Sequence, residues 1–425
     1  MGFSGVRGVL DEYKGMPREA NLLNVASFFN WMAAGVFFNT LTVFLLLQGI
    51  DLATSGLMLT AFGIIGATST LFFSGLADRY GRRRFVILGG VLASLSIIIF
   101  GIVPAKGPMG LPLLFGGTIL GGLSEAMYAS SWGAMLADKA TNEKRTSAFS
   151  LSFFISTISF AVGGFSPGIL GPLNSIYHID LVTGHRYLFV TVAAISLIGP
   201  AIVFKVSESK FSRPEGERFH LLPRKSRDAV RKYAFAGILI ALGAGMVIPL
   251  IGGWAYLKFG LADDITAPIL GGVNSLVMGV ANLATPRIAR KFGTVKTIVL
   301  TQASSTIFLF SLPFTTTFPI ASVIFITRST LMMMSNPTEQ SLLMGLVSED
   351  ERSSASAITA ALWRLPNSLS TSIGGFLMGL GGFYLALPFF LCTALYLVSI
   401  SYFWFAFKDV RLPEEKMVAP LQATN

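Results

Sequence analysis

Ionisable side chains in the middle of long apolar stretches are the residues of this sequence whose type and position suit chemistry. They are Glu125, Arg328, Glu339 and Arg364. A charge at the centre of a bilayer costs about 3 kcal/mol or more, so each side chain is expected to face protein or water rather than lipid. Each group is either functional or a hydrogen-bonded part of the core, and both interpretations are kept.

Glu125 lies in the segment GGLSEAMYASSW. A carboxyl group in surroundings of low dielectric constant can take up and release a proton near neutral pH. This position therefore predicts proton transfer or cation binding. The structural alternative is a carboxyl group held by hydrogen bonds.

Glu339 and Arg364 are predicted to form a buried ion pair. Both are about a dozen residues from Arg352, one before it and one after it. If a helical hairpin turns at Arg352, both side chains lie about 18–20 Å from the turn, at 1.5 Å per residue. Removing one partner should cost about 3–5 kcal/mol. The functional alternative is a pair that opens and closes during a conformational cycle.

The composition indicates the kind of fold that holds these residues. Of the 425 residues, 52% are hydrophobic and only 13% are charged, whereas soluble proteins have about 25% charged residues. Apolar runs long enough to cross a bilayer as a helix, about 20 residues, recur along the chain without the alternation of strands. An all-α membrane protein is therefore expected. The twelve predicted spans are 23–48, 54–77, 85–104, 111–137, 147–173, 186–204, 233–257, 264–286, 297–314, 318–346, 354–379 and 383–407.

The positive charges indicate the orientation. Of the 32 Lys and Arg residues, 27 lie in the terminal segments and the even-numbered connections, and such residues gather on the cytoplasmic side. Both termini are thus expected in the cytoplasm, in a multi-pass protein of the plasma or inner membrane. This bias accounts for the net charge of +10, so no nucleic acid partner is expected. The predicted domains are a cytoplasmic segment 1–22, a six-helix bundle 23–204, a cytoplasmic linker 205–232, a second bundle 233–407 and a tail 408–425.

Cysteine and histidine usage argues against several kinds of site. Cys392, the one cysteine, lies in an apolar run, so neither a disulfide framework nor a thiolate metal site is expected. His178, His185 and His220 are scattered, and each is predicted to be a polar loop residue. No nucleophile–base or metal-ligand pattern emerges, so neither enzyme activity nor a metal or cofactor is expected. The first twenty residues lack the apolar core of a cleaved signal peptide.

The two halves of the chain resemble each other. NEKRTSAFS (142–150) follows the fourth span and EDERSSASA (349–357) follows the tenth. Gly81 follows the second span and Gly293 follows the eighth. Tandem six-helix repeats joined by a cytoplasmic linker are typical of secondary transporters, whose halves are related by an axis along the membrane normal.

The segment SGLADRYGRRR (74–84) resembles the loop motif G-x-L-a-D-r-x-G-r-k of the major facilitator superfamily. The matching residues are Leu76, Ala77, Asp78, Arg79, Gly81, Arg82 and Arg83. Ser74 stands where the motif has its first glycine. The second half is similar, in GAGMVIPLI and PRIARKFGTVKTIVLTQ, to prokaryotic members that are drug/proton-antiporter-like and of unassigned substrate. The resemblance implies twelve transmembrane helices in two six-helix pseudo-symmetric halves.

The resemblance also implies a gating role for this motif. In the family, its Asp contacts the N-terminus of the eleventh helix when the cytoplasmic side is closed, where the helix dipole attracts an acid. Asp78 is therefore expected near residues 353–355. The alternative is a loop that only follows the positive-inside rule. The predicted gating motif comprises Asp78, Arg79, Gly81, Arg82 and Arg83.

In the family, the first, fourth, seventh and tenth spans line a central cavity. Glu125 and Arg328 lie on two of these spans and are candidates for substrate or proton binding that can pair across the cavity. Further candidate contacts are Asn30, Asn39, Tyr128, Trp254 and Tyr256. The alternative for these residues is bonding and packing between helices.

Glycine patterns are mostly expected to be structural. GGFSPGILG (163–171) resembles an antiporter motif loosely, with Ser166 in place of a glycine, and weakly supports export. Small-xxx-small helix contacts are predicted at three pairs: Gly117 and Gly121, Gly164 and Gly168, and Gly375 and Gly379.

The resemblance implies a secondary active transporter that moves a small molecule across the lipid bilayer by alternating access. Because no P-loop pattern occurs, an ion gradient is the expected energy source. Our first hypothesis is proton-coupled export of small apolar or cationic compounds by a monomer. The alternatives are proton-coupled uptake of a metabolite such as a sugar or an organic acid, and a non-transporting sensor that binds a partner through 205–232.

Overall fold

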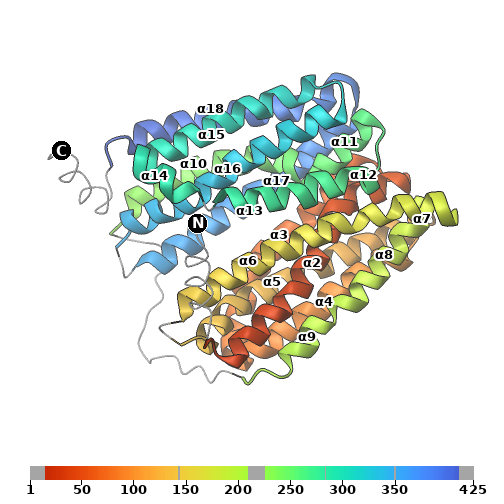
Figure 1. Cartoon of the computed structure of the whole chain (residues 1–425), viewed down its shortest axis with the longest axis horizontal. Helices are drawn as coiled ribbons and strands as arrows, with labels where there is room; N and C mark the ends of the chain where they lie inside the picture. Colours follow the sequence, from red (N-terminus) through yellow and green to blue (C-terminus); the bar gives the residue numbers. More distant parts are fainter. Residues whose placement is uncertain (1–14, 142–143, 209–224, 283, 349–350, 411–425) are drawn as a thin grey trace, which may run out of the picture. The chain divides into compact units, whose positions relative to one another are not determined.

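The computed structural model of the chain describes residues 15–141, 144–208, 225–282, 284–348 and 351–410. Within these ranges the structure is helical and contains no strand. Short 3₁₀- or π-helical segments, most of which contain a proline, also occur: η1 (Ser166–Ile169), η2 (Ile248–Leu250), η3 (Pro268–Val273), η4 (Leu312–Phe314) and η6 (Gly382–Leu385). The first three join the flanking α-helices directly. The α-helices are α2 (Arg18–Leu47), α3 (Leu52–Tyr80), α4 (Arg82–Ile102), α5 (Gly110–Lys139), α6 (Arg145–Phe165), α7 (Leu170–Tyr177), α8 (Leu181–Ser196), α9 (Ile198–Val203), α10 (Arg227–Val247), α11 (Ile251–Phe259), α12 (Asp263–Ala267), α13 (Asn274–Asn282), α14 (Thr285–Phe292), α15 (Thr294–Ser311), α16 (Phe318–Leu346), α17 (Arg352–Gly379) and α18 (Leu387–Phe407) (Figure 1).

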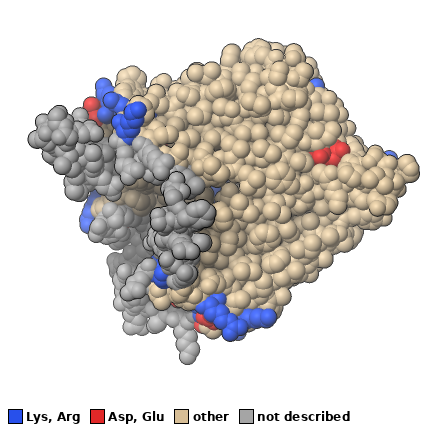
Figure 2. Space-filling model, in the orientation of Figure 1, with Lys and Arg blue, Asp and Glu red and all other residues tan. Residues whose placement is uncertain are grey.

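Twelve helical stretches of the described residues have the length of a membrane span. Ten of those within the described residues also have the hydropathy of a span. The other two are α5 and α17, with 30 and 28 residues, which is ample for a bilayer. They are the helices that carry Glu125 and Arg364, together with many Ser and Thr residues. The predicted all-α fold of twelve transmembrane helices is confirmed, and Figure 2 shows a surface with few charged side chains, mostly near its edges.

The predicted repeat has a structural counterpart. In the first half, α2 packs against α6 and α4 packs against α5; in the second half, α10 packs against α17 and α15 packs against α16 in the same pattern. Gly81 and Gly293 each precede a helix and have φ angles of 105° and 85°. Glycine adopts such angles without strain, so both repeats use it for the same tight turn.

The chain forms two compact units. The first comprises Met1–Ile50, Ala61–Pro214 and Ala262–Ser275; the second comprises Asp51–Thr60, Glu215–Leu261 and Leu276–Asn425. Helix α12 and the turn η3 thus belong to the first unit, although they follow the linker in sequence. The predicted division into two six-helix bundles at 205–232 stays a prediction, and residues 209–224 of that linker lie outside the described ones.

Glycine residues allow close approach of helices inside each unit. A Cβ atom on Gly163 of α6 would collide with the backbone of α2, and one on Gly164 would lie 2.5 Å from the backbone nitrogen of Gly272 in η3. In the second unit, a Cβ atom on Gly375 of α17 would lie 3.0 Å from the Cα atom of Gly56 in α3. The helix contacts predicted at Gly164 and Gly375 are therefore confirmed.

Candidate functional site

The motif at 74–84 comprises the end of α3, the turn at Gly81 and the start of α4. Its charged side chains hold neighbouring helix ends together. Arg82, with a side chain only 10% exposed, donates from Nη1 to Asp138 Oδ2 at 2.7 Å and from Nη2 to Asp78 Oδ1 at 2.9 Å. Asp138 lies in the last turn of α5, so this guanidinium joins the α3–α4 turn to α5 by charge-assisted bonds. The predicted contact between Asp78 and residues 353–355 stays a prediction.

The next residues of the motif bind the end of α9. Arg83 donates from Nε to the carbonyl oxygen of Val203 at 3.3 Å and from Nη2 to that of Phe204. Its backbone N–H donates to Glu208 Oε1 at 3.2 Å. A Cβ atom on Gly81 would lie 2.6 Å from Glu208 Oε2 and would displace this carboxylate, whereas the φ angle of 105° is what requires glycine in the turn.

A second polar cluster lies in the same unit. Lys139 Nζ lies 3.1 Å from Glu19 Oε2 and donates to Ser207 Oγ at 2.7 Å. Glu19 Oε1 also accepts the backbone N–H of Ser207 at 2.7 Å. These bonds connect the first turn of α2, the end of α5 and the residues after α9. In the motif itself, the guanidinium of Arg79 lies over the ring of Tyr80.

Glu125 is partly buried on α5 and faces α3. A Cβ atom on Gly66 of α3 would lie 3.2 Å from Glu125 Oε2, so the absence of a side chain at Gly66 makes room for the carboxyl group. The sequence predicted proton or cation chemistry at this position. That role stays a prediction.

Two of the predicted substrate contacts lie together. Asn30 of α2 and Tyr128 of α5 line one small cavity of the first unit, together with Trp132. The rings of Tyr128 and Trp132 stack with centroids 5.0 Å apart. Among the described residues, no group forms a hydrogen bond with the buried Tyr128 hydroxyl. Asn30 and Tyr128 thus lie at one cavity, and their role in substrate binding stays a prediction.

Asn39 has the surroundings of a helix contact. Its Nδ2 donates to the carbonyl oxygen of Gly35, one turn earlier on α2, at 2.7 Å. A Cβ atom on Gly271 of η3 would collide with its amide group. These contacts agree with the structural alternative given for Asn39, and its role in substrate binding stays a prediction.

Arg328 is buried in the second unit, with 3% of its surface exposed. Its Nη2 donates to Tyr396 Oη of α18 at 2.9 Å. Among the described residues, no group forms a hydrogen bond with its Nε, and no acidic side chain forms an ion pair with it. Trp254 is buried against Phe389, with ring centroids 4.9 Å apart, whereas Tyr256 is partly exposed.

Glu339 has neutral hydrogen-bond donors around it. Its Oε1 accepts bonds from Gln302 Nε2 and, at 2.8 Å, from Ser335 Oγ. Its Oε2 accepts a longer bond of 3.5 Å from Tyr233 Oη. The donors come from three helices, α10, α15 and α16, so the carboxyl group contributes to the core of the second unit. The ion pair with Arg364 stays a prediction.

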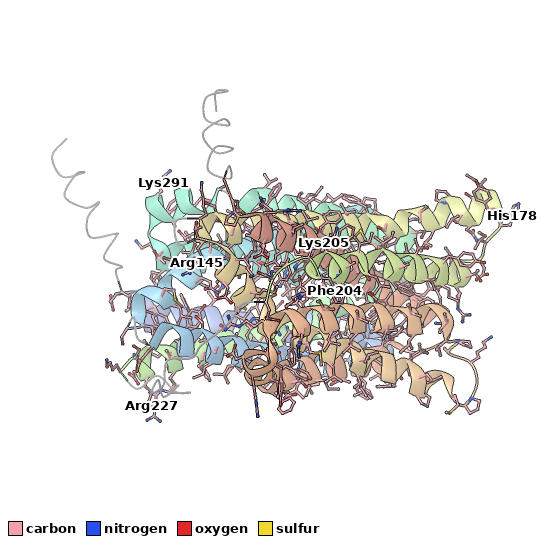
Figure 3. The ribbon with its side chains drawn as sticks, turned by 90° about the horizontal axis from the view of Figure 1, so that it is seen from below. Arg145, His178, Phe204, Lys205, Arg227 and Lys291 are labelled. Carbon is pink, nitrogen blue, oxygen red and sulfur yellow. The ribbon has the colours of Figure 1, made fainter. Side chains whose placement is uncertain are left out.

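One buried polar pair was missed by sequence reasoning. The prediction of a loop residue is wrong for His185, which lies inside α8 with an unexposed side chain. Its Nε2 lies 2.7 Å from Asp263 Oδ2 of α12. The signal that could have revealed the pair is the position of both residues at the start of apolar runs. His178 is exposed, as predicted, and Figure 3 shows it at the end of the first unit opposite Arg145.

Comparisons with known proteins agree with this architecture. The sequence profile of the Major Facilitator Superfamily matches residues 23–371. Multidrug resistance protein 1 of Bacillus subtilis (strain 168) is 25% identical over 358 residues, which are 81% of this chain and 85% of that protein. Multidrug resistance protein 2 of the same strain is 29% identical over 184 residues, 43% of this chain and 42% of that protein.

Two further likenesses concern ion exchange and fold. A Na(+), Li(+), K(+)/H(+) antiporter of Planococcus maritimus is 27% identical over 157 residues, 36% of this chain. The chain spans 34% of that antiporter's length. Among solved structures, a bacterial homologue of the human lysosomal transporter Spinster has a TM-score of 0.75 at 12% identity, over 92% of this chain and 96% of the other. That likeness shows the fold.

Proposed function

The chain belongs to the major facilitator superfamily as a multi-pass membrane transporter of the secondary type, and we propose that it exports small apolar or cationic compounds in exchange for protons. The observation that carries the proposal is the similarity to a multidrug resistance protein over 81% of the chain. The partial similarity to a cation/H(+) antiporter supports proton exchange.

Glu125 is the proposed exchange group. A carboxyl group in surroundings of low dielectric constant can bind either a proton or a cation. The two ligands then compete for one group, so binding of a cationic compound displaces the proton. Reprotonation from the opposite side displaces the compound, which gives exchange without any covalent step.

The turn around Arg82 is proposed to transmit the conformational change. Its two carboxylate partners tie the α3–α4 turn to the end of α5, the helix that carries Glu125. Helix ends joined by charge-assisted bonds move together as a body. Occupancy of Glu125 is thereby coupled to the position of the motif.

Proteoliposomes with an acidic lumen and a pH-sensitive dye inside test the proposal. Tetraphenylphosphonium added outside should make the lumen more alkaline, because each cation that enters sends protons out. Glu125→Gln should abolish this signal. Asp228→Asn is the matched control, since the Asp228 side chain is 74% exposed on α10 and its loss should leave the signal unchanged.

The sign of the pH change separates the alternatives. Acidification of the lumen on addition of a sugar or organic acid would indicate proton-coupled uptake instead of exchange. Cation entry with no pH change in wild type would refute proton coupling. A full signal in the Glu125→Gln protein would remove Glu125 from the mechanism.

A further inference from the structure

A buried acid and a buried imidazole meet in the first unit. His185 lies four residues into α8, and Asp263 is the first residue of α12. Neither side chain is exposed, and His185 Nε2 and Asp263 Oδ2 lie 2.7 Å apart. Helix α8 begins three residues after His178, which marks the end of the unit away from Arg145 (Figure 3).

The hydrogen bonds of the imidazole determine how many protons it shares with Asp263. The carbonyl oxygen of Leu181, 2.6 Å from Nδ1, can only accept, so Nδ1 carries a proton. A neutral imidazole would then present the lone pair of Nε2 to the carboxylate. Two acceptors do not remain 2.7 Å apart, so one further proton lies between Nε2 and Oδ2, on either atom.

The other charged groups near His185 do not give Asp263 a second cationic partner. Asp264, adjacent to Asp263, adds a second negative charge. Arg186 donates from Nη2 to Gln48 Oε1 at 3.4 Å, and Asp180 caps the helix by accepting a backbone N–H. No cation of the described residues forms an ion pair with Asp263 other than His185 itself.

The remaining surroundings isolate the pair. The rings of Phe44 and Phe189 lie with their centroids 5.4 and 6.3 Å from that of the imidazole. The second oxygen of Asp263, Oδ1, is buried and accepts no hydrogen bond from any described group. Within the described structure, the carboxyl group is thus held by His185 alone.

We propose that His185 and Asp263 form a proton-binding site that holds α12 against α8. When the shared proton leaves to water, a neutral imidazole and a carboxylate remain, two acceptors face each other, and the contact opens. When the proton returns, the contact closes. The site goes beyond the proposed export and requires neither a particular substrate nor Glu125.

Imidazole nitrogen chemical shifts test the proton count. The chain has three histidines, so ¹⁵N-histidine labelling gives few signals, which single substitutions assign. In wild type, His185 should keep Nδ1 protonated while one proton at Nε2 is lost as the pH rises. In Asp263→Asn, Nε2 should accept a bond from the amide and bind no proton between pH 5 and 9. The same titration in both proteins, or a proton on Nε2 and none on Nδ1, would overturn the proposal.

A distance measurement tests the helix contact. Spin labels at Tyr187 of α8 and Ile265 of α12 are suitable, since these side chains are 58% and 46% exposed. The label–label distance should increase in wild type as His185 loses its proton. It should stay constant in Asp263→Asn, which keeps a neutral hydrogen bond. Asp264→Asn is the matched control and should retain the transition. A wild-type distance that does not change while His185 deprotonates would overturn the proposed contact.

Discussion

Replacing the buried Arg328 by methionine is expected to make the protein more stable, although it removes a charged hydrogen bond. The guanidinium has one bond, 2.9 Å to Tyr396 Oη, and its Nε has no partner among the described groups. With only 3% of the residue exposed, water does not compensate the charge. Burial of such a charge without a carboxylate is unfavourable by several kcal/mol.

The magnitude follows from two opposing contributions. Losing a hydrogen bond to a charged group costs about 1.5–3 kcal/mol. Replacing a buried charge by an apolar side chain of similar volume gains several kcal/mol, and measured exchanges of buried ion pairs run from neutral to about 4 kcal/mol more stable. Because those measured exchanges already include the bonds that are lost, the expected net effect of Arg328→Met is about 1–3 kcal/mol of added stability. Transport should be lost if Arg328 takes part in binding.

The free energy of unfolding, measured by denaturant titration in detergent micelles with tryptophan fluorescence, provides the assay. Arg328→Lys is the control, because it keeps the charge but not the fork that reaches Tyr396, and it should lower the stability by about 1–3 kcal/mol. If Arg328→Met lowers stability by 2 kcal/mol or more, the reasoning is refuted, because the charge must then have a compensating partner.

Three further predictions concern the first unit. Asp138→Asn should lower the unfolding free energy by about 1 kcal/mol, since Arg82 keeps Asp78 and the Asp138 side chain is 30% exposed; no change would show that the contact is unimportant. Gly81→Ala should lower the thermal midpoint by the equivalent of about 1–3 kcal/mol, because of its φ of 105°, and an unchanged midpoint would contradict this turn. Hydrogen bonds from the side chain and backbone of Thr183 lower the pKa of Asp180. The stabilisation that Asp180 contributes is therefore present above the pKa of the unfolded chain, about 4. It is lost as the pH falls through the pKa of the folded protein. Asp180→Asn should keep the helix cap and abolish this acid dependence in pH-resolved unfolding curves; equal acid dependence in both proteins would refute the assignment.

The helices could be predicted because the bilayer sets a simple length requirement. The tenth predicted span, 318–346, coincides with α16. The sixth was predicted to start at 186, but α8 begins at Leu181. His185 and Arg186 look like residues outside the membrane, and the sequence does not show that Asp263 and Gln48 provide their partners.

The surroundings of the candidate site residues could not be predicted in the same way. Many of these helices are apolar on all sides, so the sequence does not indicate which face points inward. Tyr233, which bonds Glu339, is 106 residues away in sequence, and only helix packing brings the two together. The turn at Gly81 was predictable, because its requirement for glycine is local.

Proton release from the purified protein in weakly buffered detergent solution tests proton-coupled exchange most directly. Tetraphenylphosphonium is added while the pH and the bound cation are both measured, in wild type and in Glu125→Gln. The account predicts that binding releases protons from wild type and that the variant releases none. Cation binding to both proteins without any proton release would contradict it.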